Sequence, residues 1–165
     1  PTVPDGASGS EPVKILFVAN STSSWRGHEG WEFAGRSSEG CVPYHVEPFT
    51  VRNGVLSTRA TGEAPQLIVD DVGVAVEEPA CVAARVRASK EVSSCEMFWT
   101  TAAEPALSAD KSFRFPLVPD GKWHEVQICD DRGGEWSGLL RILRFDIGGP
   151  GDSIELHWVR LYGRQ

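Results

Sequence analysis

Six tryptophans in a chain of 165 residues are the first side chains whose chemistry invites interpretation. An indole presents a flat apolar surface on which the C–H face of a sugar ring can stack, while nearby polar groups fix the hydroxyls. Trp136 lies in a Gly-rich polar stretch, and Trp99 follows Phe98 near the end of an apolar one. Either indole can bind a ligand or pack in a core, and we take both as candidate ligand-binding residues. The indoles near the ends of other apolar stretches are expected in the core: Trp31, Trp123 and Trp158.

Polar candidates come from the stretch "LLRILRFDI" at 139–147. Alternate residues of a strand point to opposite faces, so Arg144 and Asp146 share one face and the apolar residues beside them share the other. Arg59 and Gln66 flank a turn in "TRATGEAPQL". These side chains can hydrogen-bond sugar hydroxyls, and the arginines can also bind a carboxylate or sulfate. The alternative that Arg144 and Asp146 are surface partners of little energetic weight stays open.

Residue patterns typical of catalysis are missing from the sequence. The acidic pairs 70–71, 77–78 and 130–131 are adjacent residues, which point to opposite faces of a strand and do not converge on one cleft. The four histidines show neither HxH nor HExxH spacing, and no GxSxG or phosphate-binding loop is present. Catalysis therefore has no positive support.

Composition excludes several classes of partner. The net charge of −7 argues against nucleic acid, because phosphate binding needs clustered Lys and Arg. No apolar run approaches the roughly 18–20 residues of a membrane span, and the longest, at 13–19, contains Lys14. A hydrophobic fraction of 41% with 24% charged residues is typical of an ordinary globular domain.

The four cysteines have no CxxC spacing, which makes a zinc or redox site a weak interpretation. An even number permits two disulfides, as in a secreted domain, whereas small buried thiols are the alternative. The pairing of Cys41, Cys81, Cys95 and Cys129 stays open.

The chain organisation favours one β-rich domain. Residues 1–12 are rich in Pro, Gly and Ser and read as a linker to a neighbouring domain, in a chain that opens on Pro1 rather than Met. Short β-like stretches follow without a helical apolar period, and the pair Asn53-Gly54 predicts a hairpin. We therefore expect a single all-β domain over 13–165, an antiparallel β-sandwich.

The stretch "DGKWHEVQI" at 120–128 places a Trp, a His and a Glu side by side after a turn. Period-2 alternation puts His124, Val126 and Ile128 on one face of a strand that leaves this turn. A lone His on an apolar face is usually a partly buried, hydrogen-bonded residue. We expect His124 to be part of the scaffold.

Several stretches occur in an order that resembles a known family: "VLSTRATGEAPQLIV", "MFWTT", "KSFRFPLVPDGKWHEVQI", "WSGLLRILRFDIG" and "SIELHWVRLYG". Together they resemble the galactose-binding-like jelly-roll modules attached to bacterial polysaccharide-active and cell-surface proteins. The resemblance covers about 31–163, and the stretch 13–19 is then an added edge strand. It implies a jelly-roll sandwich whose sugar site lies on the concave face of one sheet or in loops at one end.

The resemblance also implies an extracellular, cell-surface or periplasmic location. Many members of the family hold a structural calcium ion between the first and last strands, and no other cofactor is required. His157 stands where the family has an Asp in its terminal strand, and imidazole is a poor ligand for Ca²⁺. Glu32 remains a candidate metal ligand.

These observations favour a non-catalytic carbohydrate-binding module that targets an attached domain to a polysaccharide or a cell-surface glycan. Two other functions stay open. One is a small polysaccharide lyase or glycoside hydrolase that uses acids such as Glu96, Asp146 and Glu155. The other is a structural adhesion or assembly sandwich without a sugar site.

Overall fold

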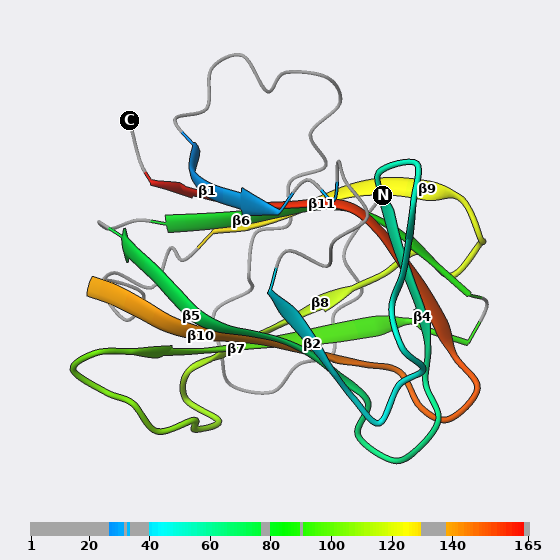
Figure 1. Cartoon of the computed structure of the whole chain (residues 1–165), viewed down its shortest axis with the longest axis horizontal. Helices are drawn as coiled ribbons and strands as arrows, with labels where there is room; N and C mark the ends of the chain where they lie inside the picture. The colour runs from blue at the N-terminus through cyan, green and yellow to red at the C-terminus, as the bar shows by residue number, and fades with distance from the viewer. Residues whose placement is uncertain are drawn as a thin grey trace.

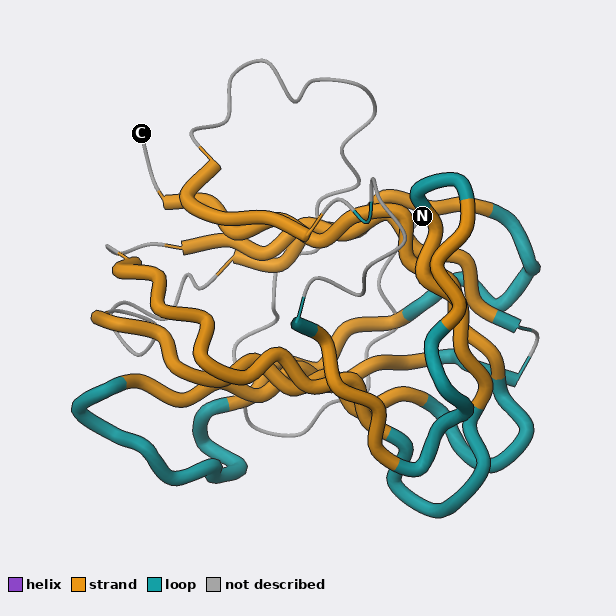
Figure 2. Tube along the Cα trace, viewed as in Figure 1, coloured by secondary structure: helices purple, strands orange, loops and turns teal. Residues whose placement is uncertain are grey.

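The computed structural model describes residues 27–31, 33, 40–76, 80–89, 91–129 and 138–163. Within them the chain forms strands and no helix, so no described helix is long and apolar enough to cross a membrane (Figures 1 and 2). The expectation of an all-β domain is confirmed. The strands are β1 (Gly27–Trp31), β2 (Cys41–Tyr44), β3 (Thr50–Arg52), β4 (Val55–Arg59), β5 (Gln66–Val76), β6 (Ala80–Ala88), β7 (Ser94–Thr101), β8 (Ser112–Pro116), β9 (Trp123–Cys129), β10 (Gly138–Ile147) and β11 (Ser153–Gly163).

Two antiparallel sheets face each other as a jelly-roll sandwich (Figure 1). Sheet A has the order β3-β4-β11-β6-β9, with β1 paired to β11 beyond the end of β4. Sheet B has the order β2-β5-β10-β7-β8. In Figure 1 sheet A forms the upper layer and sheet B the lower one, so each sheet has one face toward the core and one outer face.

The core forms where the apolar residues of alternate strand positions meet between the sheets. Leu143, Phe145 and Ile147 of β10 are buried there, as their alternation predicts. Val82 and Val86 of β6 belong to the same cluster. Alternation therefore assigns the polar residues between them to the two outer faces.

Trp123 is partly exposed on the outer face of sheet A, so the expectation that it lies in the core is wrong. The reason is its phase: Val126 of the same strand is buried, and Trp123 is three positions away, on the opposite face. Trp158 is buried as expected, but it packs with Ala83 in a small separate cluster. A bulge in β11 between Leu156 and Trp158 produces this change of face.

Two short features predicted from the sequence are confirmed. Asn53 and Gly54, with φ angles of 52° and 73°, form the two-residue turn that joins β3 to β4. His124 lies with its Nε2 atom 2.9 Å from Oδ1 of Asp120, a contact that lowers the pKa of the Asp120 carboxyl. His124 is therefore a hydrogen-bonded part of the scaffold.

The cysteines do not form two disulfides. Cys81 is disulfide-bonded, and the register of sheet A places it opposite Cys129. Cys41 and Cys95 are buried thiols. Burial raises the pKa of the Cys95 thiol, and the charges of Asp146 and Glu96 raise it further. A two-disulfide domain is therefore excluded.

Some expectations fall on residues outside the described part of the chain. These are the linker at 1–12, the added strand at 13–19, Glu32 and Trp136. They stay predictions.

Trp99→Ala is expected to destabilise the domain by about 3–5 kcal/mol, because the indole is fully buried and stacks on Phe113 with ring centroids 4.8 Å apart. Phe98→Ala, one residue earlier on the outer face, is the matched control and should cost about 1 kcal/mol. Urea unfolding of the two variants measures the difference. Equal losses would contradict this assignment of faces.

Candidate functional site

The outer face of sheet B carries polar and aromatic side chains from all five of its strands. The register aligns them in two rows that run across the strands. We call these residues the sheet B face. One row is Val42, Ile68, Arg144, Phe98 and Ser112, and the other is Tyr44, Gln66, Asp146, Glu96 and Arg114.

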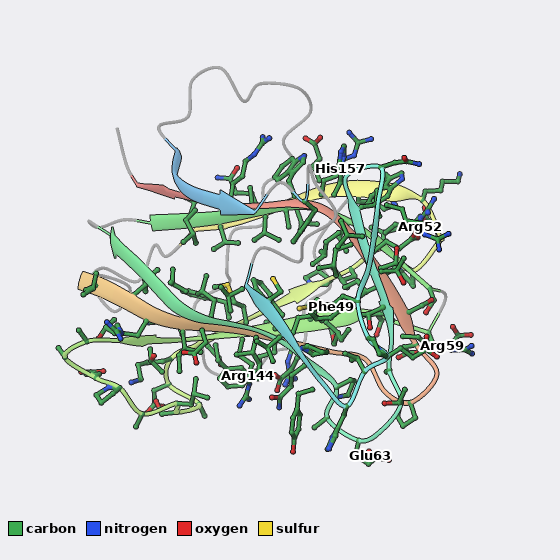
Figure 3. The ribbon with its side chains drawn as sticks, in the orientation of Figure 1. Phe49, Arg52, Arg59, Glu63, Arg144 and His157 are labelled. Atoms are coloured by element: carbon green, nitrogen blue, oxygen red, sulfur yellow. The ribbon has the colours of Figure 1, made fainter. Side chains whose placement is uncertain are left out.

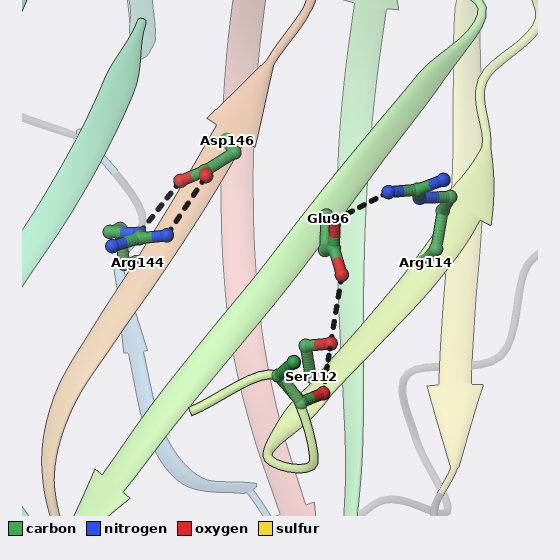
Figure 4. A network of polar contacts seen from close by, with 6 residues as sticks. Glu96, Ser112, Arg114, Arg144 and Asp146 are labelled. Carbon is green, nitrogen blue, oxygen red and sulfur yellow. Dashed lines mark hydrogen bonds and ion pairs between the residues drawn. The ribbon is translucent and has the colours of Figure 1, made fainter. Parts of the chain in front are cut away.

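Arg144 and Asp146 form the central ion pair of this face (Figure 4). Nε of Arg144 is 2.8 Å from Oδ1 of Asp146, and Nη2 donates to Oδ2 at 2.9 Å. The guanidinium also stacks on the ring of Phe98, with its central carbon 4.3 Å from the ring centroid. Burial raises the pKa of Asp146, Arg144 opposes this effect, and the net pKa lies above the ordinary value. The pair is thus held in one geometry by the neighbouring strand.

Glu96 is the centre of a second polar group beside this pair. Arg114 donates to its Oε2 at 2.7 Å, and the hydroxyl of Ser112 donates to its Oε1 at 2.8 Å. Partial burial raises the pKa of Glu96, but the bonds from Arg114 and Ser112 together outweigh it, so the pKa lies below its ordinary value. Glu96 is opposite Asp146 in the register, which makes the two groups neighbours.

Exposed apolar side chains of β2 lie at one edge of the sheet B face. Val42 and Tyr44 expose 50% and 49% of their surface. The Tyr44 ring stacks on His45 with centroids 4.0 Å apart, and Nδ1 of His45 contacts the carbonyl of Glu63 at 2.5 Å. His45 has a φ of 52°, a conformation that non-glycine residues rarely adopt unless their surroundings impose it. Tyr44 therefore presents a fixed ring beside the ion pairs.

This arrangement is suited to binding a neutral polyhydroxyl ligand. The arginines Arg144 and Arg114 balance the carboxylates Asp146 and Glu96, so these four side chains carry no net charge. Ion-paired guanidinium and carboxylate groups still offer directed hydrogen bonds, and an exposed ring offers an apolar surface. The face thus combines the two kinds of contact that sugar rings require.

The same carboxylates have little capacity for acid–base catalysis in this arrangement. All four of their oxygens face partners: both oxygens of Asp146 face Arg144, and those of Glu96 accept from Arg114 and Ser112. One cavity among the described residues lies between the sheets and is lined by apolar side chains and the Cys95 thiol, on the other side of sheet B from both groups. A general acid or base at either position would first have to give up these contacts.

The structure brings together three of the six ligand-binding residues predicted from the sequence: Arg144, Asp146 and Gln66. Arg59 lies apart from them at the end of β4 in sheet A, where its Nε donates to the carbonyl of Gly151 at 3.1 Å (Figure 3). The prediction for Trp99 is wrong, because its indole has no exposed surface to offer a sugar. Trp136 lies outside the described residues.

Sequence reasoning missed several residues of the sheet B face as ligand-binding candidates: Tyr44, Glu96, Phe98, Ser112 and Arg114. One signal was present, because alternation in "SCEMFWTT" requires Phe98 and Trp99 to face opposite ways. The pairing of β7 with β10, which places Glu96 beside Asp146, is not visible in the sequence.

The described residues contain no group of three or more His, Cys, Asp or Glu side chains that could hold a metal ion. His157 lies on the outer face of sheet A, with its ring 6.0 Å from that of Trp123. Glu32 is outside the described part of the chain.

No protein-family model matches the chain, and no curated protein matches it in sequence. Solved structures match its fold. The module BiXyn10A CBM1 is 10% identical, with a TM-score of 0.53 over 83% of this chain and 98% of that chain. A mutant carbohydrate-binding module of family 29 is 11% identical, with a TM-score of 0.53 over 92% of this chain and 94% of that one.

A third similar structure is the module CBM6cm-2 from Cellvibrio mixtus lichenase 5A in complex with cellotriose. It is 10% identical, with a TM-score of 0.50 over 85% of this chain and 100% of that chain. The chain shares the sandwich fold of carbohydrate-binding modules. At these identities the likeness concerns the fold alone.

Glu96→Gln is expected to reduce the loss of stability on acidification by about 0.5–1 kcal/mol. A carboxyl with a lowered pKa stabilises the folded state above its unfolded pKa of about 4.3, and this contribution is lost as pH falls through the folded pKa. Urea unfolding at about pH 7 and about pH 3 measures the loss.

The matched control is Glu104→Gln, which removes a carboxylate whose side chain is 70% exposed and 3.4 Å from Lys111. Its acid loss should equal that of the unmodified domain, because exposed pairs contribute little. An acid loss in Glu96→Gln as large as in the control would show that Glu96 is not stabilised by Arg114 and Ser112.

Proposed function

We propose that this domain is a non-catalytic carbohydrate-binding module whose sheet B face binds a neutral polysaccharide chain. The observation that carries the proposal is the pair of adjacent, charge-balanced groups, Arg144–Asp146 and Glu96–Arg114, on an outer sheet face. The fold adds support, since family 29 modules that share it are described in complex with cellulohexaose and with mannohexaose.

The ligand is expected to lie across the strands. The row from Tyr44 to Arg114 crosses five strands spaced about 4.8 Å apart, a length of about 19 Å that several linked sugar rings fill. Tyr44 stacks one ring at the β2 end, and the ion-paired groups hydrogen-bond hydroxyls along the row.

Charge supports a neutral ligand rather than an acidic one. A sugar carboxylate at Arg144 would have to displace Asp146, whose carboxylate accepts from Nη2 and lies 2.8 Å from Nε. Breaking a partly buried ion pair leaves one charge uncompensated, which costs free energy. A hydroxyl group that contacts the intact pair avoids this cost. Neutral hexose hydroxyls can accept or donate at the margins of the pair without breaking it.

As part of a longer protein, such a module would hold an attached domain close to its polysaccharide and raise its effective concentration there. We assign it to the galactose-binding-like modules of extracellular or cell-surface proteins, on the motifs at 31–163 that resemble them. The same resemblance is the basis for Glu32 as a candidate calcium ligand.

A hydrolase is the second candidate, and one observation favours it. Glu96 and Asp146 are cross-strand neighbours whose pKa values are displaced in opposite directions, as in many acid–base pairs. The arginines and the serine around their oxygens argue for binding instead. Release of reducing ends from mannan or cellulose oligomers, lost in Asp146→Asn, would establish the hydrolase and overturn the proposal.

Arg144→Ala is expected to weaken binding of mannohexaose or cellohexaose at least about tenfold, because it removes a charged donor and leaves Asp146 unpaired. Tyr44→Ala should weaken binding about tenfold by removing the stacking ring. Isothermal titration calorimetry measures both effects.

Arg59→Ala is the control, since it removes the same charge from sheet A and should bind like the unmodified domain. Circular dichroism must show an unchanged fold for each variant. If the unmodified domain binds no neutral glycan at millimolar concentration, the adhesion or assembly function replaces the proposed one.

A further inference from the structure

A second row of interacting side chains crosses the outer face of sheet A. Ser57, Glu155, Arg87 and Trp123 come from β4, β11, β6 and β9, and each lies opposite the next in the register. Arg87 makes a two-point ion pair with Glu155, with Nη2 donating to Oε1 at 2.7 Å and Nε contacting Oε2. The hydroxyl of Ser57 lies 3.5 Å from the same carboxylate. The two-point contact fixes the guanidinium of Arg87 beside Trp123.

Two arginines and a histidine lie around the partly exposed ring of Trp123. The guanidinium carbons of Arg87 and Arg85 lie 4.8 Å and 5.8 Å from the ring centroid, and the ring of His157 lies at 6.0 Å. His157 follows the buried Leu156, so alternation directs it to this side, on the opposite side of the sandwich from Arg144 (Figure 3). We call Trp123, Arg85, Arg87, Glu155, His157, Ser57 and Arg52 the Trp123 face.

The Trp123 face differs from the sheet B face in its charge. Its ion pairing is incomplete: Arg85 reaches Glu125 only at 4.0 Å, and among the described residues Arg52 makes no ion pair and is exposed. The charged side chains here are three arginines and two glutamates, in a chain whose net charge is −7: Arg52, Arg85, Arg87, Glu125 and Glu155. This surface is locally basic on an acidic protein, which attracts anionic ligands.

We propose that the Trp123 face is a separate binding site for an acidic polysaccharide, a chain of uronic acid units. The C–H face of one sugar ring stacks on the exposed part of the Trp123 indole, and carboxylates of the chain pair with Arg85 and Arg52. Arg52 and Trp123 stand on the two edge strands β3 and β9, about 19 Å apart across five strands, so only a chain of several units joins them. The proposal does not rest on the function of the sheet B face.

The test is calorimetric titration with a galacturonic acid hexamer, using mannohexaose as the neutral ligand of the same length. Arg52→Ala is expected to weaken binding of the acidic hexamer about two- to fivefold, the effect of one exposed ionic contact. Trp123→Ala should weaken it at least about tenfold by removing the stacking surface. Raising NaCl from about 0.05 M to about 0.5 M should weaken binding further, because salt screens exposed charges.

Arg59→Ala is again the matched control: it removes one exposed arginine from the end of β4 and should leave binding of the acidic hexamer unchanged. Arg52 is exposed, so its replacement reports on binding even if Trp123→Ala proves unstable. Saturation with mannohexaose should leave the affinity for the acidic hexamer unchanged.

Three results would overturn the proposal. The first is that the unmodified domain does not bind the acidic hexamer at millimolar concentration. The second is that Arg52→Ala binds it as tightly as Arg59→Ala. The third is that mannohexaose displaces it, or that Arg144→Ala abolishes its binding, because the acidic sugar would then occupy the sheet B face. Loss of mannohexaose binding alone would concern only the function proposed for the sheet B face.

Discussion

The alternation of side chains along each strand is the constraint on which both outer faces depend. Phe98 and Trp99 show its effect most directly. The indole is sealed in the core against Phe113, and the phenyl ring next to it is the surface on which Arg144 lies. A shift of one residue in the pairing of β7 would exchange the two rings. It would also remove Glu96 from the surface, so the core and the sheet B face are specified by the same register.

Ion pairs on these faces hold side chains in position more than they stabilise the fold. Arg144 is constrained by a carboxylate on its own strand and by an aromatic ring on the next. Arg87 is constrained by Glu155 on one neighbouring strand and by Trp123 on the other. Long side chains held at two points lose less conformational entropy when a ligand arrives. Both faces also stand on strands rather than on loops, and strands keep the spacing between such groups constant.

The sequence predicts the features that depend on alternation and local turns. It predicts few of the features that depend on the order of the strands in the sheets. The faces of β10, the turn at Asn53-Gly54 and the role of His124 follow from a few neighbouring residues, and they were predicted correctly. Arg59 was grouped with Gln66 because only a turn separates them, but that turn carries the chain from sheet A to sheet B. Trp123 is expected in the core because it lies near the end of an apolar stretch, although its phase relative to the buried Val126 places it outside.

The two faces are built from the same parts, and they differ in how completely the charges are paired. Each has an arginine stacked on an aromatic ring, a carboxylate that binds this arginine at two points, and a serine hydroxyl close to a carboxylate. On the sheet B face every arginine has a close carboxylate partner, whereas on the Trp123 face Arg52 has none among the described residues. Because a core about 10 Å thick separates the faces, ligands on them do not touch. A substitution that changes the charge of one face therefore leaves the packing between the sheets, and the geometry of the other face, unaltered.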